Sequence, residues 1–310
     1  MGEQQQTSSS NGGDQDALWN GPSGQAWVAE QAVLDDMFRP LEGLLVAAVG
    51  KTSAQHVLDV GCGTGSTTIA LARQLGTQGR CTGIDISEPM LAAARARAQQ
   101  DGSTASFIRA DAQDYAFAPA SFDSIMSRLG VMFFSDPVRA FANLRQAATP
   151  DATLHCIAWR SAAENPFMTT AERAAAPLLS NLPPRQPGAP GQFALGDRQR
   201  VRAILEEGGW TGIDVQPIDI VCTLPEPALV DYLSRLGPVG LALREADAST
   251  RASVIETVRA AFEPYVHGAT VRHTAACWMI TARASASSQT AGERATDTQF
   301  LLKSFYNCSL

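Results

Sequence analysis

Three glycines at alternate positions, Gly61, Gly63 and Gly65, follow an apolar run that contains one acidic residue, Asp59. A strand that turns into a helix on glycines brings backbone amides close to a ligand, because a Cβ atom would block the approach. Dinucleotide sites prefer the spacing G-x-G-x-x-G, but here the third glycine comes one position early and Ser66 occupies the dinucleotide position. A carboxylate before the loop would repel a pyrophosphate. The loop therefore predicts a ligand that carries a cationic amino-acid group.

Three further segments place polar side chains where neighbouring strands end. Residues 83–87 read as the end of a second strand, and Asp85 lies there, twenty residues after Gly65, which leaves room for one helix and one strand. Residues 110–112 place Asp111 after a third strand, and residues 122–127 read as a fourth. Ligands of open α/β sheets bind at the carboxyl edge, so we expect these side chains to gather around one ligand.

In their order and spacing, these segments resemble class I S-adenosylmethionine (AdoMet)-dependent methyltransferases, over about residues 19–283. Residues 18–22, 127–134 and 164–166 are similar to a bacterial group of small-molecule methyltransferases related to the ubiquinone and menaquinone biosynthesis branch. The resemblance implies an α/β fold. Its parts would be a seven-stranded, mostly parallel Rossmann-like sheet with helices on both faces, an antiparallel last strand and helical cap insertions.

The resemblance implies a role for each acidic residue. Asp59 would help to bind the methionyl ammonium, and capping of the loop's own amides is the alternative. Asp85 would accept hydrogen bonds from both ribose hydroxyls, and a helix-capping role is the alternative. Asp111 would accept from the adenine amino group, while the Ala112 N–H donates to the ring.

Apolar and basic residues complete the expected cofactor site. Ile86 and Met90 would sandwich the adenine, although helix spacing alone would also bury Met90. Arg128 would pair with the methionyl carboxylate, or else with Asp136 or a helix C-terminus. The residues assigned to the cofactor are Asp59, Gly61, Cys62, Gly63, Gly65, Asp85, Ile86, Met90, Asp111, Ala112, Ser127 and Arg128.

The implied reaction is an in-line displacement at the methyl carbon of the sulfonium. The protein then has to hold nucleophile, methyl and sulfur in line and exclude water. A general base is needed only where the acceptor keeps its proton at neutral pH. No triad or metal-ligand cluster stands out in the sequence, so the catalytic residues stay unassigned; His267 and His273 are weak candidates that a surface or structural role explains as well.

Aromatic residues predict the acceptor pocket. Trp19, Trp27, Phe133 and Trp159 lie in segments that should converge above the carboxyl edge, and Met132 adjoins them. Ordinary packing under a cap is the alternative for each one. The expected acceptor is a small, partly apolar molecule with an O, N or C nucleophile.

Strand-like and helix-like segments alternate from residue 56 to residue 159, as in βαβ units, with Ser87 and Asp136 as N-caps. A long Pro-, Ala- and Gly-rich segment then breaks the pattern, as lids and binding loops do. The predicted divisions are a disordered leader (1–16), a core with an N-terminal helical lid (17–159), a lid or cap insertion (160–197), core (198–224), a helical cap insertion (225–268), the last core strand (269–283) and a flexible tail (284–310).

The net charge of −7 disfavours a nucleic acid or an anionic membrane as partner. No stretch reaches the roughly 20 apolar residues of a membrane span, the N-terminus lacks an apolar signal core, and the six cysteines form no C-x-x-C pair. We therefore expect a cytoplasmic protein with reduced thiols and a small-molecule partner. The oligomeric state stays open, a homodimer included.

Three alternative functions remain open. An RNA or protein methyltransferase is disfavoured by the acidic charge and by a closing cap. A non-catalytic AdoMet-binding or partner-binding module is disfavoured by the intact glycines and acidic residues. An NAD(P) enzyme is disfavoured by the glycine spacing.

Overall fold

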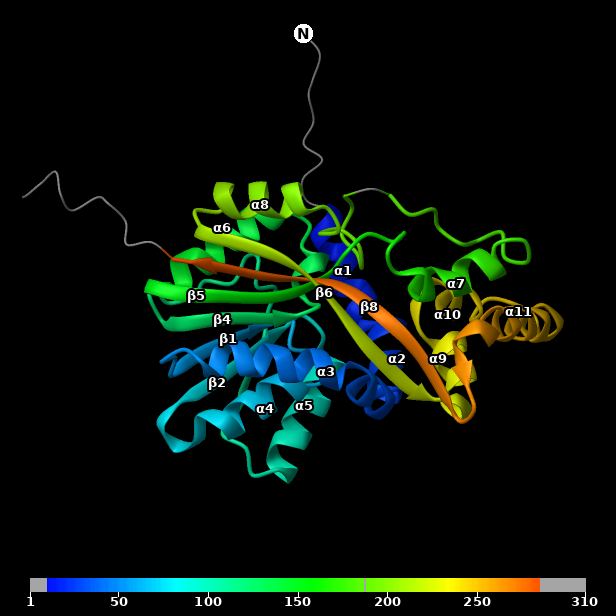
Figure 1. Ribbon diagram of the computed structural model, residues 1–310, viewed down its shortest axis with the longest axis horizontal. Coiled ribbons are helices and arrows are strands. Elements are labelled where there is room, and N and C mark those ends of the chain that lie inside the picture. The colour runs from blue at the N-terminus through cyan, green and yellow to red at the C-terminus, as the bar shows by residue number, and fades with distance from the viewer. Residues whose placement is uncertain (1–9, 187, 285–310) are drawn as a thin grey trace, which may run out of the picture.

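A mixed β-sheet forms the centre of the computed structural model, which describes residues 10–186 and 188–284 (Figure 1). The strand order is β3-β2-β1-β4-β5-β8-β6, and β7 pairs with β8. Neighbours from β3 to β5 pair in parallel, whereas β8 is antiparallel to β5, β6 and β7. The strands are β1 (His56–Val60), β2 (Arg80–Asp85), β3 (Ser106–Arg109), β4 (Phe122–Arg128), β5 (Ala148–Trp159), β6 (Thr211–Pro225), β7 (Val266–His267) and β8 (Thr270–Arg283). The predicted mostly parallel sheet with an antiparallel last strand is confirmed, and the two-residue β7 is added to the predicted seven strands.

Helices cover both faces of the sheet. Right-handed crossovers place α4 and α5 on the face that α3 covers, and α6 packs with α8 on the opposite face. The predicted N-caps are confirmed: the Ser87 hydroxyl accepts from the Met90 amide at 3.4 Å and the Asp136 carboxylate from the Arg139 amide at 3.0 Å. The helices are α3 (Gln31–Gly50), α4 (Ser66–Leu75), α5 (Glu88–Gln100), α6 (Pro137–Ala147) and α8 (Arg198–Glu207).

The N-terminal helices α1 (Ser10–Asn20) and α2 (Pro22–Ala29) join α3 to form what we call the lid. The Asn20 side chain donates to the Ile86 carbonyl (3.1 Å) and accepts from the Glu88 amide (2.9 Å), which fastens the end of α1 to the loop after β2. A disordered leader was predicted for residues 1–16, but α1 already begins at Ser10. The contacts of Asn20 anchor the C-terminal end of α1 and so support its earlier turns. Residues 1–9 lie outside the described part.

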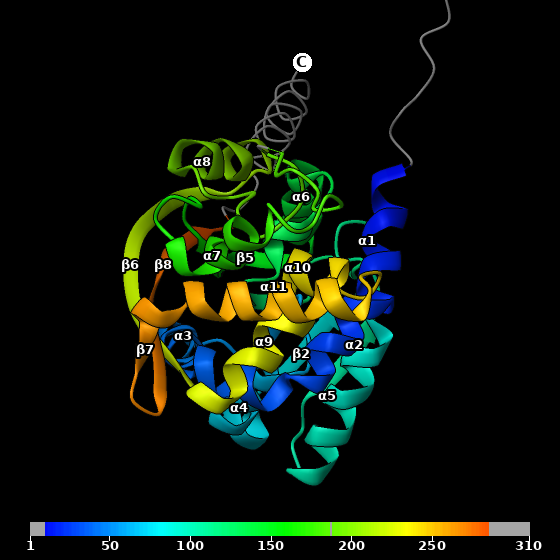
Figure 2. The ribbon, with the colours of Figure 1, turned by 90° about the vertical axis from the view of Figure 1, so that its right-hand side faces the viewer.

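The last two long strands extend beyond the rest of the sheet. β5 pairs with β8 as far as Trp159 and Cys277, while β6 and β8 continue together to Pro225 and Thr270. At this projecting end, α7 (Pro166–Ala175), α9 (Leu229–Arg235), α10 (Gly237–Ala242) and α11 (Ala248–Ala261) pack on one another as a cap (Figures 1 and 2). The Asn165 side chain fastens α7 to β8 through two hydrogen bonds of 2.9 Å with the Ala276 backbone.

Two further findings concern the ends of the chain and membranes. The predicted flexible tail lies outside the described residues from position 285 onward. Among the helices of residues 10–186 and 188–284, none is both long and apolar enough to cross a membrane.

Candidate active site

One cavity of about 480 Å³ lies at the carboxyl edge of β1, β2 and β4, between the lid and the cap. The glycine loop and the ends of the strands form one wall, and lid and cap side chains form the others. Of the residues assigned to the cofactor, those that line it are Asp59, Gly61, Cys62, Gly63, Asp85, Ile86, Met90, Asp111, Ala112 and Arg128. Trp19, Trp27, Met132, Phe133 and Trp159, assigned to the acceptor, line the same cavity.

Hydrogen bonds of its own amides hold the glycine loop at the cavity wall. The Gly63 amide donates to an Asp85 carboxylate oxygen at 2.8 Å, and the Gly65 amide donates to the Cys62 carbonyl at 3.0 Å. Gly63 has φ +54°, and a Cβ atom there would lie 2.8 Å from the Met90 Cε. A side chain at this position would therefore strain the backbone and reduce the space of the cavity.

Asp59 is a buried carboxylate at the base of the loop, with 1% of its surface exposed. The Thr68 hydroxyl donates to its Oδ2 at 2.7 Å. Burial raises the pKa of Asp59 to about 7, although the Thr68 hydrogen bond and the charge of Arg128 act in the opposite direction. A cationic ligand beside this carboxylate would stabilise its ionised form. The sequence alone gave no sign of the Thr68 contact, although a hydroxyl one turn into α4 is in reach of the end of β1.

Asp85 joins two loops. One carboxylate oxygen accepts from the Gly63 amide and the other from the Ser87 amide, at 2.8 and 2.9 Å. Burial raises the pKa of Asp85, while these amides lower it in part. The helix cap of α5 is the Ser87 hydroxyl rather than Asp85, so Asp85 supports the loops and still borders the cavity.

Asp111 occupies a turn after β3. Its carboxylate accepts from the Gln113 amide at 2.9 Å, and burial raises its pKa. Asp111 and Ala112 both line the cavity. The turn therefore presents a carboxylate and a backbone edge side by side.

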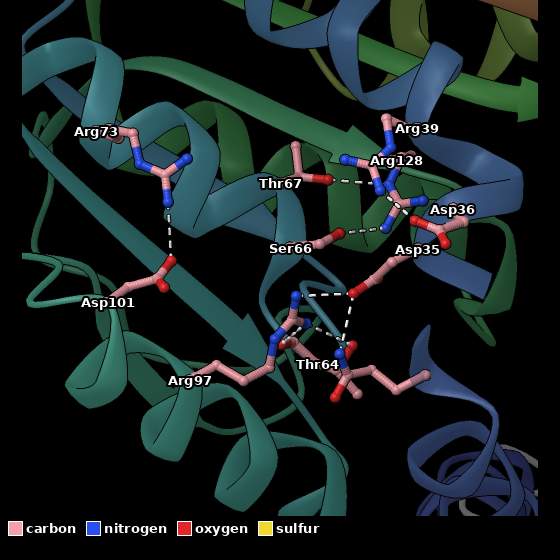
Figure 3. Close-up of polar contacts among 11 residues, drawn as sticks. Asp35, Asp36, Arg39, Thr64, Ser66, Thr67, Arg73, Arg97, Asp101 and Arg128 are labelled. Atoms are coloured by element: carbon pink, nitrogen blue, oxygen red, sulfur yellow. Dashed lines mark hydrogen bonds and ion pairs between the residues drawn. The ribbon is translucent and has the colours of Figure 1, made fainter. Parts of the chain in front are cut away.

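Arg128 at the end of β4 faces the N-terminus of α4. Its Nε donates to the Thr67 hydroxyl (2.9 Å) and an Nη to the Ser66 hydroxyl (2.8 Å), as Figure 3 shows. Asp136, the alternative partner considered from the sequence, instead caps α6. Both partners of Arg128 are neutral hydroxyls, so its charge remains available to an anionic group in the cavity.

Two residues assigned to the cofactor lie behind the cavity wall and do not line it. The Ser127 hydroxyl donates to the Val60 carbonyl at 2.7 Å and accepts from the Gly130 and Val131 amides, so it connects the ends of β1 and β4. Gly65 caps the N-terminus of α4, with Ala94 and Phe107 close to the space that a Cβ atom would take.

Aromatic rings of the lid meet aromatic rings of the core around the rest of the cavity. Trp19 contacts Phe133 edge to face with ring centres 5.0 Å apart, and Phe38 contacts Trp159 in the same manner at 6.0 Å. The cap adds apolar and aromatic side chains that the sequence analysis did not single out: Phe167, Met168, Tyr232, Leu236, Val239 and Phe262. An ion pair between Glu172 and Arg185, in which Nε donates to Oε2 at 2.9 Å, also borders this side.

The two candidate catalytic histidines lie outside the cavity lining, whereas Cys62 lies in it. His267 is exposed on β7, and His273 is buried on β8, stacked on Phe167 with ring centres 3.9 Å apart. Neither histidine lines the cavity, and burial lowers the pKa of His273 to about 4. Burial raises the pKa of the Cys62 thiol, which keeps it protonated. Among the described residues, no three His, Cys, Asp or Glu side chains gather in a way that could hold a metal ion.

Comparison with protein families identifies the part of the chain that carries the glycine loop. Residues 57–151 match the family model described as a methyltransferase domain. An uncharacterized protein of Mycobacterium tuberculosis is 34% identical over 125 residues, which are 40% of this chain and 44% of that protein. Nocamycin O-methyltransferase of Saccharothrix syringae is 33% identical over 120 residues (38% and 43%), and demethylmenaquinone methyltransferase of Lactiplantibacillus plantarum is 33% identical over 114 residues (36% and 48%). The chain therefore spans less than half the length of these curated relatives.

Solved structures share the fold over more of the chain. A putative methyltransferase from Bacillus halodurans matches with a TM-score of 0.53 and 14% identity, covering 79% of this chain and 99% of that one. Phosphoethanolamine N-methyltransferase 2 of Haemonchus contortus, solved with AdoMet, matches with a TM-score of 0.53 and 16% identity, covering 87% of this chain and 60% of that one. The family match defines the class for the part of the chain that carries the glycine loop: residues 57–151 are similar to a methyltransferase domain, and these solved structures share the fold.

Proposed function

We propose that this chain transfers a methyl group from AdoMet to an O, N or C nucleophile of a small, partly apolar molecule. The observation that carries the proposal is the cavity of about 480 Å³, in which the glycine loop and carboxylates lie on one wall and aromatic side chains from lid and cap on the others. When bound, AdoMet supplies a methyl group on a sulfonium, which is already an activated electrophile. The chain's own residues have to bind AdoMet and the acceptor, orient them toward each other, and exclude water.

The side chains around the cavity fit the groups of AdoMet. Asp59 is a buried carboxylate that a cation would stabilise, and Arg128, whose hydrogen-bond partners are neutral hydroxyls, offers its charge to a carboxylate. Asp85, at the end of β2, would accept hydrogen bonds from a ribose diol. Asp111 would accept from the adenine amino group, and the Ala112 N–H would donate to the ring. Ile86 and Met90 would pack on the adenine.

The acceptor would occupy the part of the cavity that the lid and the cap enclose. Its walls carry Trp19, Trp27, Phe133 and Trp159 together with the cap's Phe167, which favours an apolar or aromatic body. Two curated relatives are named as methyltransferases of nocamycin and demethylmenaquinone, both small molecules, and this agrees with such an acceptor. We assign no general base, because the histidines considered lie away from the cavity.

Calorimetric titration with AdoMet, with NADH in a parallel experiment, tests the cofactor. We expect AdoMet alone to bind; binding of the nicotinamide instead would reject the proposal. Turnover is then followed as S-adenosylhomocysteine release over a panel of small phenols, amines, carboxylic acids and quinols. Cofactor binding without turnover of any panel member would favour the non-catalytic module, and salt-sensitive RNA binding near micromolar would favour a macromolecular acceptor.

A further inference from the structure

The guanidinium of Arg97 on α5 connects the glycine loop with the lid (Figure 3). One Nη donates to the Thr64 carbonyl at 2.7 Å and, more weakly, to the Thr64 hydroxyl at 3.3 Å. The other Nη donates to the Asp35 carboxylate on α3 at 2.7 Å. Thr64 and Asp35 both line the cavity, so one side chain holds two of its walls together.

The contact with the Thr64 carbonyl fixes the orientation of a peptide plane in the glycine loop. Because the peptide bond is planar, a carbonyl held on one side also fixes the N–H of the next residue, Gly65. That N–H donates to the Cys62 carbonyl at 3.0 Å. Arg97 therefore stabilises the loop conformation in which the Gly63 amide donates to Asp85 at the cavity wall.

The contact with Asp35 fixes the lid. Asp35 lies on the second turn of α3, and its carboxylate also accepts a hydrogen bond of 3.0 Å from the Gln31 side chain. Gln31 is on α3 as well, so that bond connects α3 to no other element, whereas the bond from Arg97 connects α3 to α5. Without Arg97, the Asp35 carboxylate would face a cavity that already contains Asp59 and Asp85.

A second ion pair provides a comparison within the same part of the fold. Arg73 on α4 donates to Asp101, directly after α5, at 2.9 Å, but these side chains are 72% and 45% exposed and line no part of the cavity. Arg97 and Asp35 are 26% and 19% exposed. A half-buried, charge-assisted contact is stronger than a surface pair, which contributes little.

We propose that Arg97 is a positioning residue that holds the glycine loop and the lid helix α3 in one arrangement around the cofactor. It touches the protein and not the reacting atoms, and it slows the release of AdoMet by keeping the lid docked. The inference rests on the proposed function, because it assigns an effect on AdoMet binding.

The experiment measures the affinity and the dissociation rate of AdoMet for the full chain and for four variants: Arg97→Ala, Arg97→Lys, Asp35→Asn and the control Arg73→Ala. Trp19 and Trp27 line the cavity from the lid, so tryptophan fluorescence in a stopped-flow instrument reports lid docking. We expect Arg97→Ala to weaken binding about 10- to 100-fold, the range for losing a charge-assisted hydrogen bond, mainly through faster dissociation. Lysine has no planar fork to reach two partners, so the AdoMet affinity of Arg97→Lys should lie between those of Arg97→Ala and the unaltered chain. The affinity of Arg73→Ala should stay within about twofold of the unaltered chain.

A double-mutant cycle separates the two contacts of Arg97. If Arg97 acts through the lid, Asp35→Asn combined with Arg97→Ala should dissociate AdoMet no faster than Arg97→Ala alone. Fully additive effects would overturn the lid part of the proposal, and an Arg97→Ala affinity equal to that of Arg73→Ala would overturn it entirely. If Arg97→Ala melts below the assay temperature, Arg97→Lys and Asp35→Asn test the proposal instead: AdoMet affinities equal to that of Arg73→Ala in both would overturn it. Absence of AdoMet binding by the unaltered chain is a different result, which rejects the proposed function itself.

Discussion

Gly61 and Gly130 lie in direct backbone contact across the floor of the cavity. A Cβ atom on Gly61 would lie 2.7 Å from the Gly130 Cα, and a Cβ atom on Gly130 would lie 2.6 Å from the Val60 carbonyl oxygen. The Ser127 hydroxyl holds the two chain segments together by contacting both. The turn after β4 thus supports the glycine loop after β1, and only a residue without a side chain fits at either position.

We expect Gly130→Ala to destabilise the fold by roughly 1–3 kcal/mol, the usual cost of overpacking, and to weaken AdoMet binding because the glycine loop must shift. Urea unfolding measures the first effect and calorimetry the second. Gly43→Ala is the matched control, since Gly43 is exposed in α3 with no atom within 4 Å of an added Cβ. It should raise the free energy of unfolding by about 0.5–1 kcal/mol. Equal stability of Gly130→Ala and the unaltered chain would contradict the close contact.

The central part of the fold was predictable because its signals are local. The apolar run of β1, the glycines after it and the N-caps Ser87 and Asp136 each lie within a few residues of the element that they define. Periodicity and capping therefore predicted the alternation of strands and helices from residue 56 to residue 159 and the N-caps of α5 and α6 correctly. The resemblance that rests on these motifs named twelve residues for the cofactor, and all of them except Gly65 and Ser127 line the cavity.

Contacts between distant segments could not be predicted in this way. Arg97 reads as an ordinary exposed helix residue until α3 is placed beside it, and Arg128 found partners in Ser66 and Thr67 because α4 starts next to the end of β4. The chemistry of His273 depends on Phe167, more than a hundred residues away. Such pairings follow from tertiary packing, which one sequence does not reveal.

Asp85→Ala should weaken AdoMet binding about 100-fold, because hydrogen bonds from two ribose hydroxyls to a carboxylate would be lost. The substitution also leaves the Gly63 and Ser87 amides without their acceptor, so we expect a moderate fall in melting temperature. Asp85→Asn keeps one carbonyl acceptor and should lose less affinity. Titration calorimetry on both variants checks the order, and unchanged affinity in Asp85→Ala would remove the ribose assignment.

The affinity for AdoMet should increase as the pH rises from 6 to about 7.5. Burial raises the pKa of Asp59 to about 7, so part of the free protein carries a proton there at neutral pH. A bound ammonium favours the ionised carboxylate, so binding lowers this pKa and releases the proton. Above roughly pH 8 an α-amino group loses its own charge, which limits the increase.

Calorimetry in two buffers of different ionisation enthalpy at pH 7 measures the released proton. Asp59→Asn should bind AdoMet more weakly and without this proton release, because the amide does not titrate. A flat affinity between pH 6 and 7.5 in the unaltered chain would show that Asp59 does not face the ammonium.

The lid and the cap are joined by an ion pair, and its removal should lower the stability of the whole arrangement. Glu30, between α2 and α3, is 6% exposed, and Arg235 at the end of α9 donates to its Oε1 at 2.8 Å. We expect Arg235→Ala to destabilise the fold by about 1–2 kcal/mol, less than breaking a fully buried pair would, because the arginine itself is 47% exposed.

Urea unfolding of Arg235→Ala and of the double variant Glu30→Gln with Arg235→Ala shows why stability is lost: because the Glu30 charge is left buried without a partner, or because the contact itself is gone. The double variant should be more stable than Arg235→Ala, since a neutral amide costs less to bury than an unpaired carboxylate. A double variant that is less stable than Arg235→Ala would mean that Glu30 is stabilised by its surroundings without the arginine, and the connection between lid and cap would then depend on apolar packing alone.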